Sequence, residues 1–158
     1  MLPELQFAIM NLHARYAQAI DENRLEEWPG FFVERARYVV TTAENLERGL
    51  RLGMIYATSR AMLQDRVRSL REANVYEAQR YRHIIGVPLL EPGEDGVTQA
   101  ITSFIVVRIM HSGETLLFAT GRYCDRIVKD ANNDELRFAE RIVVLDSRQV
   151  DTLMALPL

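Results

Sequence analysis

The chain has 158 residues, the length of one ordinary domain, and its 48% hydrophobic and 26% charged residues are typical of a globular protein and exclude a disordered or collagen-like chain. Its 19 basic and 22 acidic residues give a net charge of −3, which argues against a protein built mainly to bind nucleic acid. The single cysteine, Cys124, excludes an internal disulfide, a four-cysteine zinc site and a Rieske cluster held by this chain alone.

The first half of the chain is predicted to be mainly helical. We expect helices over residues 3–23, 25–32 and 59–74, the last capped by Thr58 or Ser59. In the first helix one apolar face recurs at helical spacing, and a second stripe that includes Phe7 and Met10 runs almost opposite to it. A helix that is apolar on two sides is usually covered on two sides. We therefore expect the sheet on one side and a further helix or another chain on the other.

The second half of the chain is predicted to consist of long antiparallel strands. We expect strands over residues 37–42, 83–90, 98–110, 115–128 and 135–147, with a tight turn at 111–114. Pro88 indicates an edge or a bulge, and Gly121 indicates a bulge or a sharp bend. Because strands of this length must twist and curl, we predict an α+β fold: a curved antiparallel sheet closed by the N-terminal helices into a cone with a cavity.

Two features of the composition point to partners. The chain has eighteen arginines and one lysine, and arginine is enriched at protein interfaces, although a GC-rich genome would give the same bias. Residues 153–158 are wholly apolar, whereas chain ends are usually polar. We expect this tail to lie in a groove, either on a neighbouring subunit or on its own domain. No apolar stretch approaches the roughly 20 residues of a membrane span, so we expect a cytoplasmic protein that binds neither membrane nor nucleic acid.

The histidines offer the chain's main candidates for chemistry. His13, His83 and His111 lack the spacing of a known metal motif, so we expect no metal site, one buried histidine and two surface ones. Tyr16, Asp21 and His83 could form an acid–base set, in which an Asp–His pair acts as the general base and the tyrosine polarises a carbonyl. The simpler interpretation is that Tyr16 belongs to the core and that Asp21 accepts a hydrogen bond at a helix end.

Several segments together carry a resemblance to a known family. The segments are AID at 19–21, EWPGFF at 27–32, REANVYE at 71–77, RYRHIIG at 80–86, RIMHSGET at 108–115 and DTLMALPL at 151–158. With these segments the chain is similar to the small (β) subunits of aromatic-ring-hydroxylating dioxygenases, and the resemblance runs from the first helix to the last residue.

The resemblance implies an NTF2-like cone in a non-catalytic, structural subunit. It implies an α3β3 hexamer whose small subunits contact one another as a trimeric base. The large subunit would carry the Rieske [2Fe–2S] cluster, the mononuclear Fe(II) and the substrate pocket, and a reductase would supply electrons from NAD(P)H. The enzyme would add both atoms of O2 to an aromatic dicarboxylate and give a cis-dihydrodiol. The family offers no catalytic, cofactor-binding or metal-binding residue to transfer to this chain.

Two alternatives remain open at this point. One is a stand-alone lyase or isomerase with a cone fold that uses Tyr16, Asp21 and His83. The other is a cone that binds a ligand without chemistry, which small aromatic acids would reveal by raising its melting temperature.

Overall fold

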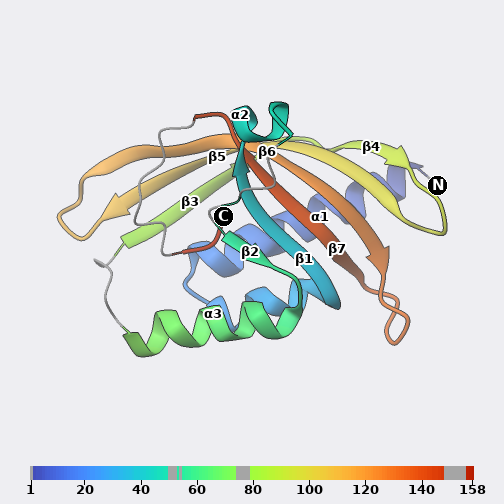
Figure 1. Cartoon of the computed structure of the whole chain (residues 1–158), viewed down its shortest axis with the longest axis horizontal. Helices are drawn as coiled ribbons and strands as arrows, with labels where there is room; N and C mark the ends of the chain where they lie inside the picture. Colours follow the sequence, from blue (N-terminus) through green and yellow to red (C-terminus); the bar gives the residue numbers. More distant parts are fainter. Residues whose placement is uncertain (1, 50–52, 54, 74–78, 148–155) are drawn as a thin grey trace.

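The computed structural model describes residues 2–49, 53, 55–73, 79–147 and 156–158. Its helical elements are α1 (Leu2–Asp21), the 3-10 helix η1 (Leu25–Phe31), α2 (Ala43–Glu47) and α3 (Arg60–Ala73). Its strands are β1 (Phe32–Thr42), β2 (Ile55–Ala57), β3 (Gln79–Ile85), β4 (Leu89–Pro92), β5 (Thr98–Met110), β6 (Thr115–Lys129) and β7 (Leu136–Leu145). Figure 1 shows the long, twisted strands arching over α1 and α3. The predicted α+β architecture is confirmed.

The sheet is curved but its two edges do not meet. Its strand order is β2-β1-β7-β6-β5-β3, and β4 pairs with β5. Neighbouring strands are antiparallel except β1 and β7, which run parallel with Tyr38 opposite Arg141. The prediction of a wholly antiparallel sheet is therefore wrong at this pair. Tight turns fix the directions of β5, β6 and β7, whereas no short connection joins β1 to β7, so a parallel pairing is possible there.

The hydrophobic core lies between the concave face of the sheet and α1. The inward residues of β5 are Ala100, Thr102, Phe104 and Val106, all buried. Ile101 and Ile105 point the other way and are 45% and 40% exposed. On α1, the buried apolar residues are Ile9, Leu12, Tyr16, Ala17, Ala19 and Ile20. Phe7 and Met10 of the second stripe remain exposed, so the described part of this chain does not supply the second cover that we expected.

The strand predicted over residues 83–90 is in fact two strands. β3 ends at Ile85 and β4 begins at Leu89, because Pro88 has no N–H group for the ladder. Gly86 still donates to the Ser103 carbonyl at 2.9 Å, so the chain stays beside β5 across the break. The short elements α2 and β2 were not predicted from the pattern. Of the two caps proposed for the third predicted helix, Ser59 is the one that accepts a backbone N–H, from Met62.

Gly121 does not mark a bulge. It pairs in register with Phe104 on β5 and Leu145 on β7, and the β5–β6 irregularity lies between the partners of Val106 and Val107 instead. A Cβ atom on Gly121 would overlap the carbonyl oxygen of Val144. The glycine is therefore needed for the close approach of β6 and β7, and the prediction of a bulge at this residue is wrong.

The end of the chain contributes to the core of its own domain. Leu156 and Leu158 are buried within the main hydrophobic cluster. The Tyr16 and Tyr38 hydroxyls both donate to the Leu158 carbonyl oxygen, at 2.7 and 2.9 Å, and the Tyr81 hydroxyl donates to the Leu156 carbonyl at 3.4 Å. Of the two locations expected for the apolar tail, residues 156–158 take the one on their own domain. Residues 153–155 lie outside the described residues.

Candidate functional site

The structure brings Asp21 and His83 together. Asp21 ends α1, and its Oδ1 lies 2.6 Å from His83 Nδ1 while its Oδ2 accepts the His83 backbone N–H at 2.9 Å. Among the described strands, β3 is the last on its side of the sheet, so the carboxylate accepts a hydrogen bond from a backbone N–H that no described strand pairs with. The exposed fractions of the His83 and Asp21 side chains are 0% and 4%. The pair links the end of α1 to the free edge of the sheet.

Tyr16 does not complete an acid–base set with this pair. Its hydroxyl donates to the Leu158 carbonyl and accepts the indole N–H of Trp28 at 3.0 Å. The side chain is fully buried among aromatic rings, with Phe138 at 5.6 Å between centroids. The core interpretation of Tyr16 and the hydrogen-bonding interpretation of Asp21 are the ones that the contacts support.

Sequence reasoning missed a buried ionic cluster around Arg141. This arginine, on β7, has no exposed surface and forms a two-point ion pair with Asp125 on β6, with both N–O distances 2.9 Å. Its Nη2 also lies 2.7 Å from His13 Nδ1, and His13 Nε2 lies 3.2 Å from the Thr102 hydroxyl. The guanidinium is stacked against three aromatic rings, those of Tyr16, Tyr123 and Phe138, at 4.4, 3.7 and 4.0 Å from their centroids.

The surroundings of this cluster fix the charges of its members. Burial, with a smaller contribution from the Arg141 charge, lowers the pKa of His13 from 6.5 to about 2. Neutral His13 therefore accepts from Arg141 at Nδ1, and its Nε2–H donates to Thr102. Burial alone would lower the pKa of Arg141, but the charge and hydrogen bonds of Asp125 outweigh it and hold the pKa above its ordinary value. Burial raises the pKa of the Asp125 carboxyl, and Arg141 opposes that rise.

The strand pattern contains a signal that could have revealed this cluster. The inward residues of β7 are Phe138, Arg141, Val143 and Leu145, and those of β6 include Tyr123, Asp125 and Ile127. A charge of each sign therefore occupies an apolar face on adjacent strands. Because buried charges are almost always paired, two such residues predict an ion pair across the strands.

A cleft lies between α1 and β3. It has a volume of about 460 Å3 and is lined by Met10, His13, Ala14, Ala17, Gln18, Asp21, Arg82, His83, Ile85 and Gly86. The imidazole of His83 is not exposed to solvent in this cleft, and the ring of His13 is held by Arg141 and Thr102. The cleft therefore offers no accessible general base.

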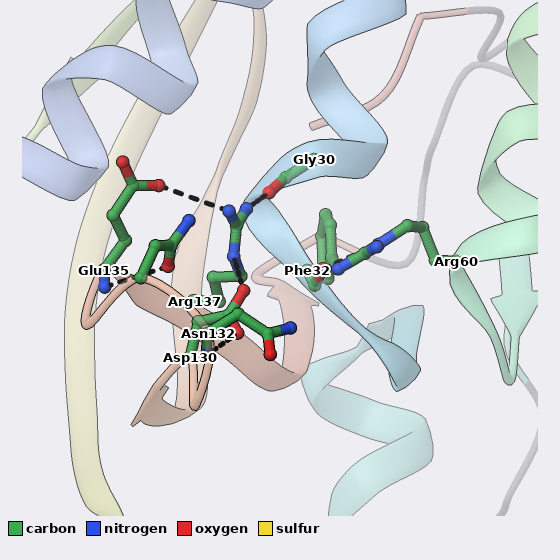
Figure 2. Close-up of polar contacts among 8 residues, drawn as sticks. Gly30, Phe32, Arg60, Asp130, Asn132, Glu135 and Arg137 are labelled. Atoms are coloured by element: carbon green, nitrogen blue, oxygen red, sulfur yellow. Dashed lines mark hydrogen bonds and ion pairs between the residues drawn. The ribbon is translucent and has the colours of Figure 1, made fainter.

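A second polar cluster joins the turn between β6 and β7 to η1. Arg137 donates to the Gly30 carbonyl, to Asp130 at 2.7 Å and to Glu135 at 3.2 Å (Figure 2). In the same view, Arg60 at the start of α3 donates to the Phe32 carbonyl at 2.9 Å. The contacts with Gly30 and from Arg60 tie helical elements to strands, and those with Asp130 and Glu135 brace the turn between β6 and β7, so this cluster has a structural role.

The three histidines do not converge on a metal site. His13 and His83 are both buried and hydrogen-bonded, whereas His111 lies exposed in the β5–β6 turn. The expectation of a single buried histidine is therefore wrong. Within the described ranges, no group of three or more histidine, cysteine, aspartate or glutamate residues is placed to hold a metal ion. No described helix is long and apolar enough to cross a membrane.

Comparison with known proteins extends over the whole chain. The SnoaL-like domain family matches residues 4–142. Terephthalate 1,2-dioxygenase, terminal oxygenase component subunit beta 2, from Comamonas sp., is 48% identical over 158 residues, which cover 100% of both chains. The chain belongs to the small subunits of aromatic-ring-hydroxylating dioxygenases.

Other relatives support the same placement of this small subunit. The anthranilate 1,2-dioxygenase small subunit of Burkholderia cepacia is 36% identical, over 96% of this chain and 93% of that one. A putative aromatic-ring-hydroxylating dioxygenase β subunit from Novosphingobium aromaticivorans, whose crystal structure has been solved, has 33% sequence identity to this chain. The structural match covers 99% of each chain with a TM-score of 0.89. The resemblance inferred from the sequence segments is confirmed, and so is the predicted fold.

Proposed function

We propose that this small subunit belongs to a terminal oxygenase that acts on terephthalate and converts it to a cis-dihydrodiol with both atoms of O2. The observation that supports this substrate is the 48% identity, over the full length of both chains, to the terephthalate 1,2-dioxygenase subunit, against 36% for the anthranilate enzyme. The substrate is an aromatic dicarboxylate, as the resemblance implied.

We further propose that the chain, as one domain over residues 1–158, contributes no catalytic, cofactor-binding or metal-binding residue. The large subunit of a cytoplasmic α3β3 hexamer would carry the Rieske [2Fe–2S] cluster and the mononuclear Fe(II), and a reductase would deliver electrons from NAD(P)H. The hydrogen bonds of the buried polar groups support this division. Arg141 is bonded to both Asp125 and His13, and Asp21 is bonded to His83. These ionisable side chains therefore stabilise the fold.

The outer face of the sheet supports assembly with other subunits. A row of cross-strand neighbours runs over six strands of this face: Leu89, Ile101, Cys124, Ile142, Val39 and Tyr56. Leu89, Ile101 and Tyr56 are 65%, 45% and 49% exposed. Val39 is buried and Cys124 and Ile142 are half-buried, so the exposed apolar surface of the row lies mainly toward its two ends. Exposed apolar side chains that gather on one face are typical of the core of a subunit interface. We assign the row to the contacts between small subunits in the trimeric base.

The assignment of the row is tested by a charge placed in it. Ile101→Glu should leave the small subunit folded, because the side chain points to solvent, but should dissociate the hexamer. Leu46→Glu is the matched control, since Leu46 is 43% exposed and lies on α2, away from the row. Native mass spectrometry of the purified oxygenase reports the assembly. An intact hexamer with Ile101→Glu would contradict the assignment.

The function is tested by separating the subunits. The tagged small subunit should co-purify with the large subunit, and only the complex, supplied with reductase and NADH, should convert terephthalate. We expect the isolated small subunit to contain no iron and to form no product. Turnover by the isolated chain, or stoichiometric iron in it, would refute the proposed division. Turnover of anthranilate in preference to terephthalate would refute the substrate alone.

A further inference from the structure

The segment Leu156–Leu158 contacts strands that are far apart in the sheet. The Tyr38 hydroxyl on β1 donates to the Leu158 backbone oxygen at 2.9 Å, and the Leu158 amide donates to the same hydroxyl at 3.1 Å. The Tyr81 hydroxyl on β3 donates to the Leu156 backbone oxygen at 3.4 Å. In the strand order, β7, β6 and β5 separate β1 from β3. One short segment therefore joins two strands on opposite sides of the sheet.

Simple distances show that these contacts require a curled sheet. Neighbouring strands lie about 4.8 Å apart, so the four spacings from β1 to β3 amount to roughly 19 Å along the sheet. Two residues of extended chain span at most about 7 Å. With one hydrogen bond at each end, the Tyr38 and Tyr81 hydroxyls lie no more than about 13 Å apart. Side chains stand roughly perpendicular to a sheet, so in a flat sheet the two hydroxyls would be too far apart for the segment.

A further contact ties the segment to the helices. Tyr16 on α1 donates to the Leu158 backbone oxygen at 2.7 Å, and Trp28 on η1 donates its indole N–H to the Tyr16 oxygen at 3.0 Å. The side chains of Leu156 and Leu158 are buried in the main core cluster. Buried hydroxyls are normally hydrogen-bonded, so loss of the segment would leave the tyrosine hydroxyls without these partners. The segment is thus held by α1 and by both sides of the sheet.

We propose that Leu156–Leu158 is a strap that sets the curvature of the sheet and, through it, the shape of the outer face on which the small subunits meet. Because the strap reaches both strands only in the curled sheet, its contacts stabilise the curled form over flatter ones. The apolar row from Leu89 to Tyr56 crosses β5, β6, β7 and β1 on the other face, so the same curl fixes the relative positions of its two exposed ends. The link to the outer face rests on the proposed function, which assigns the row to contacts between small subunits.

The curvature is tested by a distance across the sheet. Nitroxide labels replace Tyr56 on β2 and Arg80 on β3, both exposed, in the full-length small subunit with Cys124→Ala, since Cys124 is its only cysteine. Double electron–electron resonance should give a longer mean distance and a wider distribution when Leu158→Ala is added. Leu25→Ala removes an equally buried leucine on η1 and is the matched control, which should keep the distance. An unchanged distance in Leu158→Ala, or an equal change in Leu25→Ala, would overturn the proposal.

Removing only hydrogen bonds keeps the proposal testable if Leu158→Ala does not fold. Tyr38→Phe combined with Tyr81→Phe retains both rings but removes the hydroxyls that join the two strands to the strap, so it should also lengthen the distance. Tyr123→Phe is the control, because its buried hydroxyl has no hydrogen-bond partner within the described part of the chain. The same distance in the double variant as in Tyr123→Phe would refute the strap.

The effect on assembly is measured on the complete oxygenase. In native mass spectrometry of a dilution series, the complex with Leu158→Ala should dissociate at a concentration at least about tenfold higher than the complex with Leu25→Ala. Equal dissociation of the two complexes would overturn the link between the strap and the outer face. If Ile101→Glu also leaves the hexamer intact, the proposed role of the outer face fails, whereas the distance measurement still decides whether the strap sets the curvature.

Discussion

The pH dependence of folding should show that His13 is held neutral in the core. The unfolded chain protonates this histidine below about pH 6.5, whereas the folded chain does so only at about pH 2. Between these values the unfolded state binds more protons, so the free energy of unfolding falls as the pH falls. One pKa unit corresponds to 1.36 kcal/mol, so His13 alone should lower the free energy of unfolding by about 2 kcal/mol between pH 7 and pH 5. That is a large part of the roughly 5–15 kcal/mol typical of a domain.

His13→Asn isolates this contribution. The asparagine amide oxygen can still accept from Arg141, which donates to His13 Nδ1 in the wild type, but it cannot take up a proton. The free energy of unfolding of both proteins is measured in urea at pH 7, 6 and 5. Its fall from pH 7 to pH 5 should be smaller in His13→Asn than in the wild type by about 2 kcal/mol. His111→Asn, at the exposed turn histidine, should keep the wild-type slope. Equal slopes for His13→Asn and the wild type would show that His13 is not buried as a neutral acceptor.

Two further substitutions test the cluster and the strand contact. Arg141→Met leaves Asp125 as a buried carboxylate without its partner and should lower the free energy of unfolding in urea by about 3–5 kcal/mol. Arg37→Met breaks an ion pair whose arginine is 43% exposed and should lower it by less than about 1 kcal/mol. Gly121→Ala forces a Cβ against a backbone carbonyl and should cost roughly 1–3 kcal/mol by thermal unfolding, while Gly30→Ala enters open space and should be close to neutral. A fully stable Gly121→Ala protein would contradict the close approach of β6 and β7.

The long elements of this fold could be predicted from local patterns because each is a simple periodic segment. β5 begins and ends at the predicted residues, and the turn at Gly113 has the positive φ that the glycine allows. The parallel pairing of β1 with β7 could not be predicted, because it depends on contacts between residues a hundred positions apart. Pro88 was predicted to indicate an edge or a bulge, and the strand is instead divided there into β3 and β4, because whether a proline bends, ends or divides a strand depends on its neighbours in space.

The functional prediction depended on different information from the fold. The family could be identified from short segments such as RYRHIIG at 80–86, yet these residues alternate between the two faces of β3, with Tyr81 and His83 buried and Arg80 and Arg82 exposed. Of the three residues proposed for catalysis, only Asp21 and His83 meet. The burial of Arg141 was not predicted, because arginines usually lie on the surface. Its inward position beside Asp125 on the neighbouring strand is what shows that it is buried.

The distribution of polar and apolar groups between the two faces of the sheet explains why a cone of this kind works as a subunit. The concave face holds an ion pair, a neutral histidine and tyrosine hydroxyls that bind the chain's own Leu156–Leu158 segment. The outer face carries the apolar row through Ile101, of which Leu89, Ile101 and Tyr56 stay exposed in the described part of the chain. Because removing apolar surface from water drives association, we propose that the outer face stabilises assembly. The ionisable side chains of the interior, which could otherwise serve in catalysis, instead stabilise the folded cone.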